Sequence, residues 1–223
     1  MKNIKIISLL VLAILIFSAC TKTQVEYFED GSVKSSIPYR FGKEHGLCKY
    51  YFINAPHPLK IEVEMKNGKK EGRFVKYFIN GKLDTRCTYH NDLLEGLEET
   101  YHIQGYKVST TNYLHGKKHG LHTVYYPNGE IVEQGSFYED LYDGDWAYYD
   151  ERGVLLGEGK FDKGNGVQKG YDAMGNLIKI VHFQDNHKQG EDIELNAEGD
   201  TVKITLFDQD RIVSVNGEPV GDE

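Results

Sequence analysis

A short pattern recurs about every 24 residues along most of this chain. A tyrosine stands four residues before a turn glycine, as in Tyr77/Gly81, Tyr101/Gly105 and Tyr125/Gly129. The remaining copies and variants are Tyr27/Gly31, Tyr51/Ala55, Tyr149/Gly153, Tyr171/Gly175 and Leu195/Gly199. A fixed period of this length is typical of an array of small supersecondary units. The chain is therefore expected to form a repeat protein, in which each unit contacts mainly its neighbours.

A second turn alternates with the first in every unit. An aromatic residue follows each turn glycine by eight positions, as Tyr89 and Phe137 do, and a residue type that tolerates positive φ comes three positions later. Each unit thus has the order turn, strand, turn, strand, which is a β-hairpin. We predict an all-β fold, an elongated single-layer antiparallel meander of about eight hairpins over residues 27–213.

Two stretches of the chain carry a family resemblance. The strings GDWAYYDERGVLLGEGKFDKG and YYPNGEIVEQGSF resemble the bacterial variant of the MORN repeat. The resemblance extends over roughly residues 27–213 and implies a hairpin-repeat scaffold. Bacterial chains with this repeat are often labelled YwqK-family antitoxins, so the resemblance also raises an antitoxin or immunity function.

The first 19 residues have a different composition. Lys2 and Lys5 precede a 12-residue apolar run, residues 6–17, and small residues lead to Cys20. This is the pattern of a secretory signal peptide, too short for a transmembrane helix. The ending FSAC resembles a lipobox, which implies lipidation of Cys20; an uncleaved N-terminal anchor is the alternative. We expect a signal peptide (1–19), a lipidated linker (20–26) and an acidic tail (214–223), and a cell-envelope location, at the outer membrane in a Gram-negative host.

Cys48 and Cys87 remain after the signal peptide. An exported protein meets an oxidising compartment, where a disulfide must be considered. In a simple meander the two residues lie three strands apart, or about 14 Å, whereas a disulfide needs Cα atoms within about 7 Å. We therefore predict two unpaired, packed thiols.

Alternation along the strands predicts two sheet faces. The first face is expected to carry the repeated aromatics with small residues such as Cys87, Gly135 and Gly159 between them. The second face is expected to carry Phe52 and six further aromatics that we take as candidate binding residues, because exposed aromatic patches often mark binding sites. These are Tyr50, Phe74, Phe78, Tyr126, Trp146 and Tyr148. Packing of these rings on one another is the alternative, and a bulge in any strand would exchange the faces.

Charge is distributed unevenly along the chain. Residues 20–120 hold 16 basic and 12 acidic residues, whereas residues 121–223 hold 8 and 22. A cluster of basic residues at positions 66–76 suits anionic lipid headgroups beside the anchor. The acidic second half suits basic partners. A nucleic-acid partner is not expected, because the overall sign of the charge is wrong.

Several local patterns are also compatible with other structures or sites. Residues 92–100, DLLEGLEET, have the leucine spacing of a helix, but the repeat register places them in a turn and strand. His115, His119 and His122 could bind zinc, yet His119 occupies a slot that is merely polar in other units. No nucleophile elbow, phosphate loop or calcium loop is present in the sequence. We expect no catalytic residues, no metal and no cofactor, and no enzyme activity.

These observations lead to two hypotheses of function. The first is a non-catalytic envelope lipoprotein whose repeats bind or organise a protein, glycan or lipid partner, with the membrane reached through the lipid anchor. The second is an antitoxin or immunity protein that neutralises a toxin, which would have to arrive through the envelope if the chain is exported.

Overall fold

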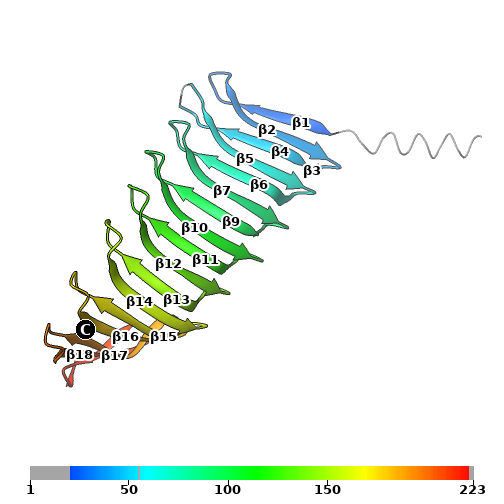
Figure 1. The fold of residues 1–223 in the computed structure, drawn as a ribbon. Helices are drawn as coiled ribbons and strands as arrows, with labels where there is room; N and C mark the ends of the chain where they lie inside the picture. Colours follow the sequence, from blue (N-terminus) through cyan, green and yellow to red (C-terminus); the bar gives the residue numbers. More distant parts are fainter. Residues whose placement is uncertain (1–20, 55, 221–223) are drawn as a thin grey trace, which may run out of the picture. The chain divides into compact units, whose positions relative to one another are not determined.

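The computed structural model describes residues 21–54 and 56–220. All regular elements within these ranges are β-strands (Figure 1). The chain divides into two compact units, residues 1–93 (unit 1) and 94–223 (unit 2). The predicted signal peptide and Cys20 lie outside the described residues.

In unit 1, strands that follow one another in the chain pair antiparallel. The strands are β1 (Lys22–Tyr27), β2 (Val33–Arg40), β3 (Lys43–Glu44), β4 (Gly46–Tyr51), β5 (Leu59–Lys66), β6 (Lys69–Tyr77) and β7 (Leu83–His90). The two-residue β8 (Leu93–Leu94) stands at the division between the units.

Unit 2 continues the same antiparallel order of strands. Its strands are β9 (Gly96–Tyr101), β10 (Lys107–Leu114), β11 (Lys117–Tyr125), β12 (Ile131–Tyr138), β13 (Leu141–Tyr149), β14 (Leu155–Asp162), β15 (Asn165–Tyr171), β16 (Leu177–Gln184), β17 (His187–Leu195), β18 (Thr201–Asp208), β19 (Arg211–Val215) and β20 (Glu218–Pro219). The all-β hairpin meander predicted from the repeat is thus confirmed. Residues 92–100 form turn and strand, as the register indicated.

The strands extend beyond the predicted array at both ends. β1 begins at Lys22, within the segment expected to be a linker, and pairs with β2 from Tyr39 back to Val33. β20 lies within the segment expected to be an acidic tail. The regular hydrogen bonding of these strands therefore reaches closer to Cys20 than the 24-residue pattern alone indicated.

Each first turn, the one after the repeated tyrosine, is followed by a one-residue β-bulge. In unit 1, Lys76 pairs with Thr85 but Tyr77 pairs with Leu83, so Asp84 is extra. The same shift occurs after Tyr27, Tyr51, Tyr101, Tyr125, Tyr149, Tyr171 and Leu195. Because side chains alternate between faces, one extra residue moves every following side chain to the opposite face.

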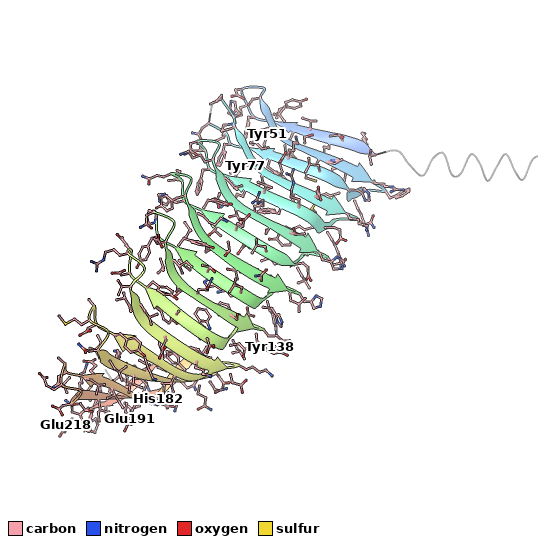
Figure 2. All side chains as sticks on the ribbon, viewed as in Figure 1. Tyr51, Tyr77, Tyr138, His182, Glu191 and Glu218 are labelled. Carbon is pink, nitrogen blue, oxygen red and sulfur yellow. The ribbon has the colours of Figure 1, made fainter. Side chains whose placement is uncertain are left out.

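The bulges define two sheet faces. The ladder face carries Cys87 and the residues in its repeat slot: Val63 in unit 1, and Thr111, Gly135, Gly159, Val181 and Thr205 in unit 2. The tyrosine face carries the repeated tyrosines, which Figure 2 labels for Tyr51 and Tyr77. Two hydrogen bonds confirm this placement: the Tyr77 hydroxyl donates to Glu62 at 3.5 Å, and the Tyr171 hydroxyl donates to Glu158 at 2.6 Å.

The second turns are two-residue turns in which both residues have positive φ, for example His115 (52°) and Gly116 (83°). Next to this turn the returning strand usually carries two extra residues, since Tyr113 pairs with Lys118 but Thr111 pairs with His122. The sixth 24-residue repeat, whose second turn joins β14 and β15, lacks these two extra residues. There β14 and β15 pair without any shift, which accounts for the shorter repeat in this part of the sequence.

Asn186 compensates for the two missing residues. Elsewhere an Asp accepts a hydrogen bond from the backbone N–H found 22 positions earlier, as Asp140 does from Lys118 at 2.9 Å. Asn186 instead reaches back 44 positions, where its Oδ1 accepts from the Tyr142 N–H at 2.8 Å. Its Nδ2 donates to the Asp140 carbonyl at 2.9 Å. One side chain thus connects turns on either side of the shortened one.

The main hydrophobic cluster lies on the ladder face of unit 2 and contains Phe137, Trp146 and Phe161. The Trp146 ring lies edge-on to Phe137 at 5.1 Å and to Tyr142 at 4.7 Å, measured between ring centroids. Gly135 lies directly beneath the indole, where a Cβ atom would overlap Trp146. The alternation of large rings and small residues is therefore what allows a single-layer sheet to bury an aromatic side chain.

Candidate binding surface on the tyrosine face

Trp146 and Tyr148, two of the predicted binding residues, lie on the ladder face and not on an opposite one. Trp146 pairs with Gly159 and is 3% exposed, and its Nε1–H donates to the Ser136 carbonyl at 3.1 Å. Tyr148 stacks on Trp146 at 6.3 Å, and burial raises its pKa strongly. The predicted separation of these rings from the ladder is wrong. They are part of the core of unit 2, and a binding role for them remains an untested prediction.

Phe74 and Tyr50 also lie on the ladder face, in unit 1. Phe74 pairs with Cys87 and meets the Tyr89 ring edge-on at 5.7 Å, with the Lys70 ammonium 5.6 Å from the centre of the Phe74 ring. Tyr50 pairs with Ile61, and burial raises its pKa to about 12. Tyr50 lines a shallow groove together with Phe28, Phe52 and Ile53, apart from Phe74.

Phe78 and Tyr126 start first turns and do not lie on a sheet face. The Phe78 N–H donates to the Lys82 carbonyl at 2.8 Å, and the Tyr126 N–H donates to Glu130 at 2.8 Å. The Tyr126 hydroxyl also donates to the Tyr149 carbonyl at 2.9 Å, which fixes one turn to the next. The six candidates therefore do not form one patch within either unit.

The bulge after each first turn is the reason for these differences. Without it, the repeated tyrosines and the later aromatics would share one face, as the sequence prediction assumed. With it, Tyr149 lies on the tyrosine face, whereas Phe161 and Trp146 lie on the ladder face. The signal that could have shown this is the match of large and small residues, since Gly135 and Gly159 flank Trp146 in the strand pairing.

The larger groove of unit 2 lies on the tyrosine face and was missed by the sequence prediction. It has a volume of about 870 Å³ and crosses strands β11 to β15. It is lined by Leu121, Gln134, Ser136, Asp145, Ala147, Tyr149, Leu155, Glu158, Lys160, Val167 and Lys169, and also by Trp146, Gly135, Gly159 and Gly166. One of the six predicted binding residues, Trp146, therefore contributes to the groove. Ala147 is a small residue in this lining, whereas the same slot of other repeats carries larger side chains, such as Ile193.

The groove combines an apolar floor with charged borders. Leu121 and Leu155 are 48% and 39% exposed. Lys169 lies 3.8 Å from the Glu158 carboxylate, which also accepts the hydrogen bond from Tyr171. That bond raises the pKa of Tyr171, because ionisation would place two negative charges side by side. A surface with these properties can bind a ligand that has both apolar and polar groups.

The two cysteines are placed as predicted. Cys48 and Cys87 are both buried, and no disulfide joins them. The chain of pairs Cys48–Val63, Val63–Phe74 and Phe74–Cys87 separates them by three strand steps on one face. Burial raises the pKa of the Cys48 thiol to about 11, so this thiol is held in its unreactive form.

The three histidines at positions 115–122 have separate partners. His115 lies 3.6 Å from Glu95, and the His119 ring packs on Tyr138 at 5.2 Å. His122 Nδ1 is 2.8 Å from the Thr111 hydroxyl. Within residues 21–54 and 56–220, no group of three His, Cys, Asp or Glu side chains is arranged to hold a metal ion. The described part of the chain also contains no helix long and apolar enough to cross a membrane.

The fold and the groove define a class, an antiparallel β-hairpin repeat protein with exposed sheet faces. Residues 118–140 match the family model of the MORN repeat variant. This match covers β11 and β12, one hairpin step of unit 2, and the same tyrosine, turn and glycine register runs through the other units. The chain therefore carries a MORN-type repeat.

Other comparisons add little. Among curated proteins no significant match was found. Of the solved structures, an S. aureus TarM mutant crystallised with fondaparinux, alpha-GlcNAc-glycerol and UDP is 11% identical, with a TM-score of 0.18, 86% of this chain covered and 24% of the other. The TcdB2-TccC3 structure is 14% identical, with a TM-score of 0.19, 85% of this chain covered and 15% of the other. The chain thus spans at most a quarter of these structures, and scores this low carry no argument about function.

Proposed function

We propose that this protein is a non-catalytic cell-envelope lipoprotein whose repeats serve as a binding scaffold. The observation that carries the proposal is the groove of about 870 Å³ on the tyrosine face of unit 2. A one-layer sheet has no second layer to cover such a surface, and solvent-exposed leucines that line a groove are typical of a binding site. The MORN-type repeat supports a scaffold role.

The proposed envelope location rests on the sequence of residues 1–20. A basic start, a 12-residue apolar run and a lipobox-like FSAC ending support export and lipidation of Cys20. Fractionation of whole cells and mass spectrometry of the mature N-terminus test this part, with Cys20→Ala as the comparison. We expect the wild type in membranes with a lipid on Cys20, and Cys20→Ala released or mis-sorted. Equal amounts of both forms in the cytoplasm would contradict the proposal.

Photo-crosslinking in cells tests the groove. A photoreactive amino acid at Ala147 stands on the floor of the groove, and the same substitution at Ile193 stands in the same repeat slot outside it. We expect a specific crosslinked partner from position 147 and none from position 193. The same products from both positions would show that the groove is not the binding surface.

A second candidate, an immunity protein against a toxin that reaches the envelope, is favoured by the charge of the second half. Residues 121–223 carry 22 acidic and 8 basic residues, which suits a basic partner. The test is co-expression with any toxin that a neighbouring gene encodes. Relief of toxicity by the wild type, and loss of relief when acidic residues around the groove are neutralised, would support this candidate over a general scaffold.

A further inference from the structure

We infer that one edge of unit 1 lies against the membrane, with an anionic lipid bilayer as its partner and Phe41 as the residue that enters the headgroup region. This inference deepens the proposed function and rests on it. The edge, here called the anchor edge, consists of Lys22, Arg40–His45, Lys66–Glu71 and His90–Leu93.

The strand pairing places the start of the described chain on this edge. Lys22, the first residue of β1, lies opposite Tyr39, directly beside the turn at Phe41 and Gly42. Backbone hydrogen bonds connect neighbouring second turns along this edge. The Gly68 N–H donates to the Glu44 carbonyl at 2.8 Å, and the Asp92 N–H donates to the Lys70 carbonyl at 3.0 Å.

The short distance to the anchor fixes which edge meets the membrane. Only Thr21 separates the proposed lipidation site, Cys20, from the first residue of β1. Two residues of extended chain span at most about 7 Å. A lipid on Cys20 therefore holds Lys22, at the start of the anchor edge, within about one Debye length of the headgroups.

The charge of the anchor edge complements an anionic bilayer. It contains six basic residues and three acidic ones. Lys22, Lys43, Lys66 and Lys69 are exposed, and among the described residues none of their ammonium groups has a carboxylate within ion-pair distance. The opposite edge of unit 1, formed by residues 28–32, 52–54, 56–58 and 78–82, carries one lysine and two carboxylates. Only the anchor edge thus has the sign that anionic headgroups attract.

Phe41 is unusual in both exposure and backbone conformation. Its side chain is 72% exposed, and its φ of 52° lies in the left-handed region. The residues in the same turn slot elsewhere are all polar: Asn67, Asn91, His115, Glu139, Lys163, Asp185 and Gln209. Asn and Asp suit this conformation better than a bulky aromatic side chain. The Arg40 guanidinium lies 5.4 Å from the centre of the Phe41 ring, so a cation lies beside the exposed apolar ring, a combination that suits an interfacial membrane contact.

Fluorescence in vesicles tests this orientation. The full chain, purified from membranes, is reconstituted into phosphatidylcholine vesicles with or without phosphatidylglycerol, with bromine on the acyl chains as quencher. The reporter is Phe41→Trp, and the matched control is Ile53→Trp, which is also exposed (68%) but lies at the opposite edge. The native Trp146 is buried and gives the same background in both variants.

We expect quenching and a blue shift for the tryptophan at position 41 in anionic vesicles, and neither for the one at position 53. Lys66→Gln with Lys69→Gln should lower the equilibrium constant for docking on the anionic bilayer by roughly five-fold per lysine. The charge-matched pair Lys60→Gln with Lys82→Gln, at the opposite ends of the strands, should leave the quenching unchanged.

Flotation of the wild type separates the two possible failures. A chain that does not float with the vesicles overturns the proposed anchor and with it this inference. A chain that floats but shows equal quenching at positions 41 and 53, or equal quenching in anionic and neutral vesicles, overturns only the inference that the anchor edge docks on anionic lipid.

Discussion

Gly135 has no room for a side chain beneath Trp146, which makes Gly135→Ala a sharp test of the packing on the ladder face. A Cβ atom at position 135 would overlap the indole. The ring cannot move aside freely, because it packs on Phe137 and Tyr142 and donates a hydrogen bond to the Ser136 carbonyl. The substitution therefore forces a shift in the best-packed part of unit 2.

The magnitude follows from what the shift disrupts. Overpacking a well-ordered core costs about 1–3 kcal/mol, and loss of one favourable aromatic pair adds about 0.5–1.5 kcal/mol. Alanine has less conformational freedom than glycine in the unfolded chain, which offsets this loss of stability by about 0.4–1 kcal/mol. We expect Gly135→Ala to lower the free energy of unfolding by about 2–3 kcal/mol. Gly170→Ala, whose Cβ would meet the Lys179 Cβ at 3.3 Å, is the matched control and should cost under about 1 kcal/mol.

A double-mutant cycle isolates the contact between the two residues. Trp146→Ala alone should cost about 3–5 kcal/mol. In that background Gly135→Ala should be nearly neutral, which gives a coupling free energy of about 2 kcal/mol. Urea unfolding followed by circular dichroism measures all four proteins, and the fluorescence of the single tryptophan reports on the two that retain it. Equal costs of Gly135→Ala in both backgrounds, within about 0.5 kcal/mol, would refute the packing argument.

Four further predictions concern the turns, the thiols and pH. Asn186→Ala removes the bonds to Tyr142 and Asp140 and should cost about 1–2 kcal/mol in urea unfolding; a change near zero would mean that the shortened turn is held by other contacts. Phe41→Asn should raise stability by about 0.5 kcal/mol, because Asn suits positive φ, and a large loss would indicate that the ring has a structural role. In the Cys20→Ala chain, Cys48 and Cys87 should react with a thiol reagent only on unfolding, and fast reaction of the native protein would contradict their burial. The backbone N–H of Val154 holds the pKa of Asp150 below its usual 3.8. The stabilisation of the folded state by the ionised Asp150 carboxylate is therefore present above pH 3.8 and is lost as the pH falls through the lower folded pKa. The free energy of unfolding of Asp150→Asn should therefore depend less on acid pH, and an unchanged dependence would contradict this.

The hairpin order could be predicted from the sequence because turn chemistry is local. The tyrosine–glycine spacing located each first turn, and the positive-φ slots occupied by residues such as Gly116 and Asn186 located the second turns. The register also decided correctly that residues 92–100 are not a helix. The burial of Cys48 and Cys87 followed from their strand positions alone.

The assignment of faces could not be predicted in the same way. The extra residue after each first turn is charged in unit 1, as Asp84 is, and aliphatic in unit 2, as Val108 is. Either type also occurs at ordinary strand positions, so the effect of the extra residue appears only in the pairing of the next strand. The sequence therefore does not predict the candidate groove. Its lining residues Ala147 and Tyr149 share the tyrosine face, and this is apparent only once the bulges are known. The sequence prediction places Trp146 on the binding face because it assigns the complementary Gly135 to the opposite face.

The most direct test of this account is the register across one bulge. In the structure Tyr101 pairs with Lys107 but Thr100 pairs with Ser109, whose hydroxyl groups are 2.7 Å apart, so Val108 is the extra residue. The double variant Thr100→Cys with Ser109→Cys should therefore form a disulfide readily on mild oxidation, because directly opposite residues meet the distance that this bond needs. Thr100→Cys with Val108→Cys should form it slowly or not at all. The reverse preference would mean that the bulge is absent and that the two faces of the sheet, with the groove and the core, have been assigned wrongly.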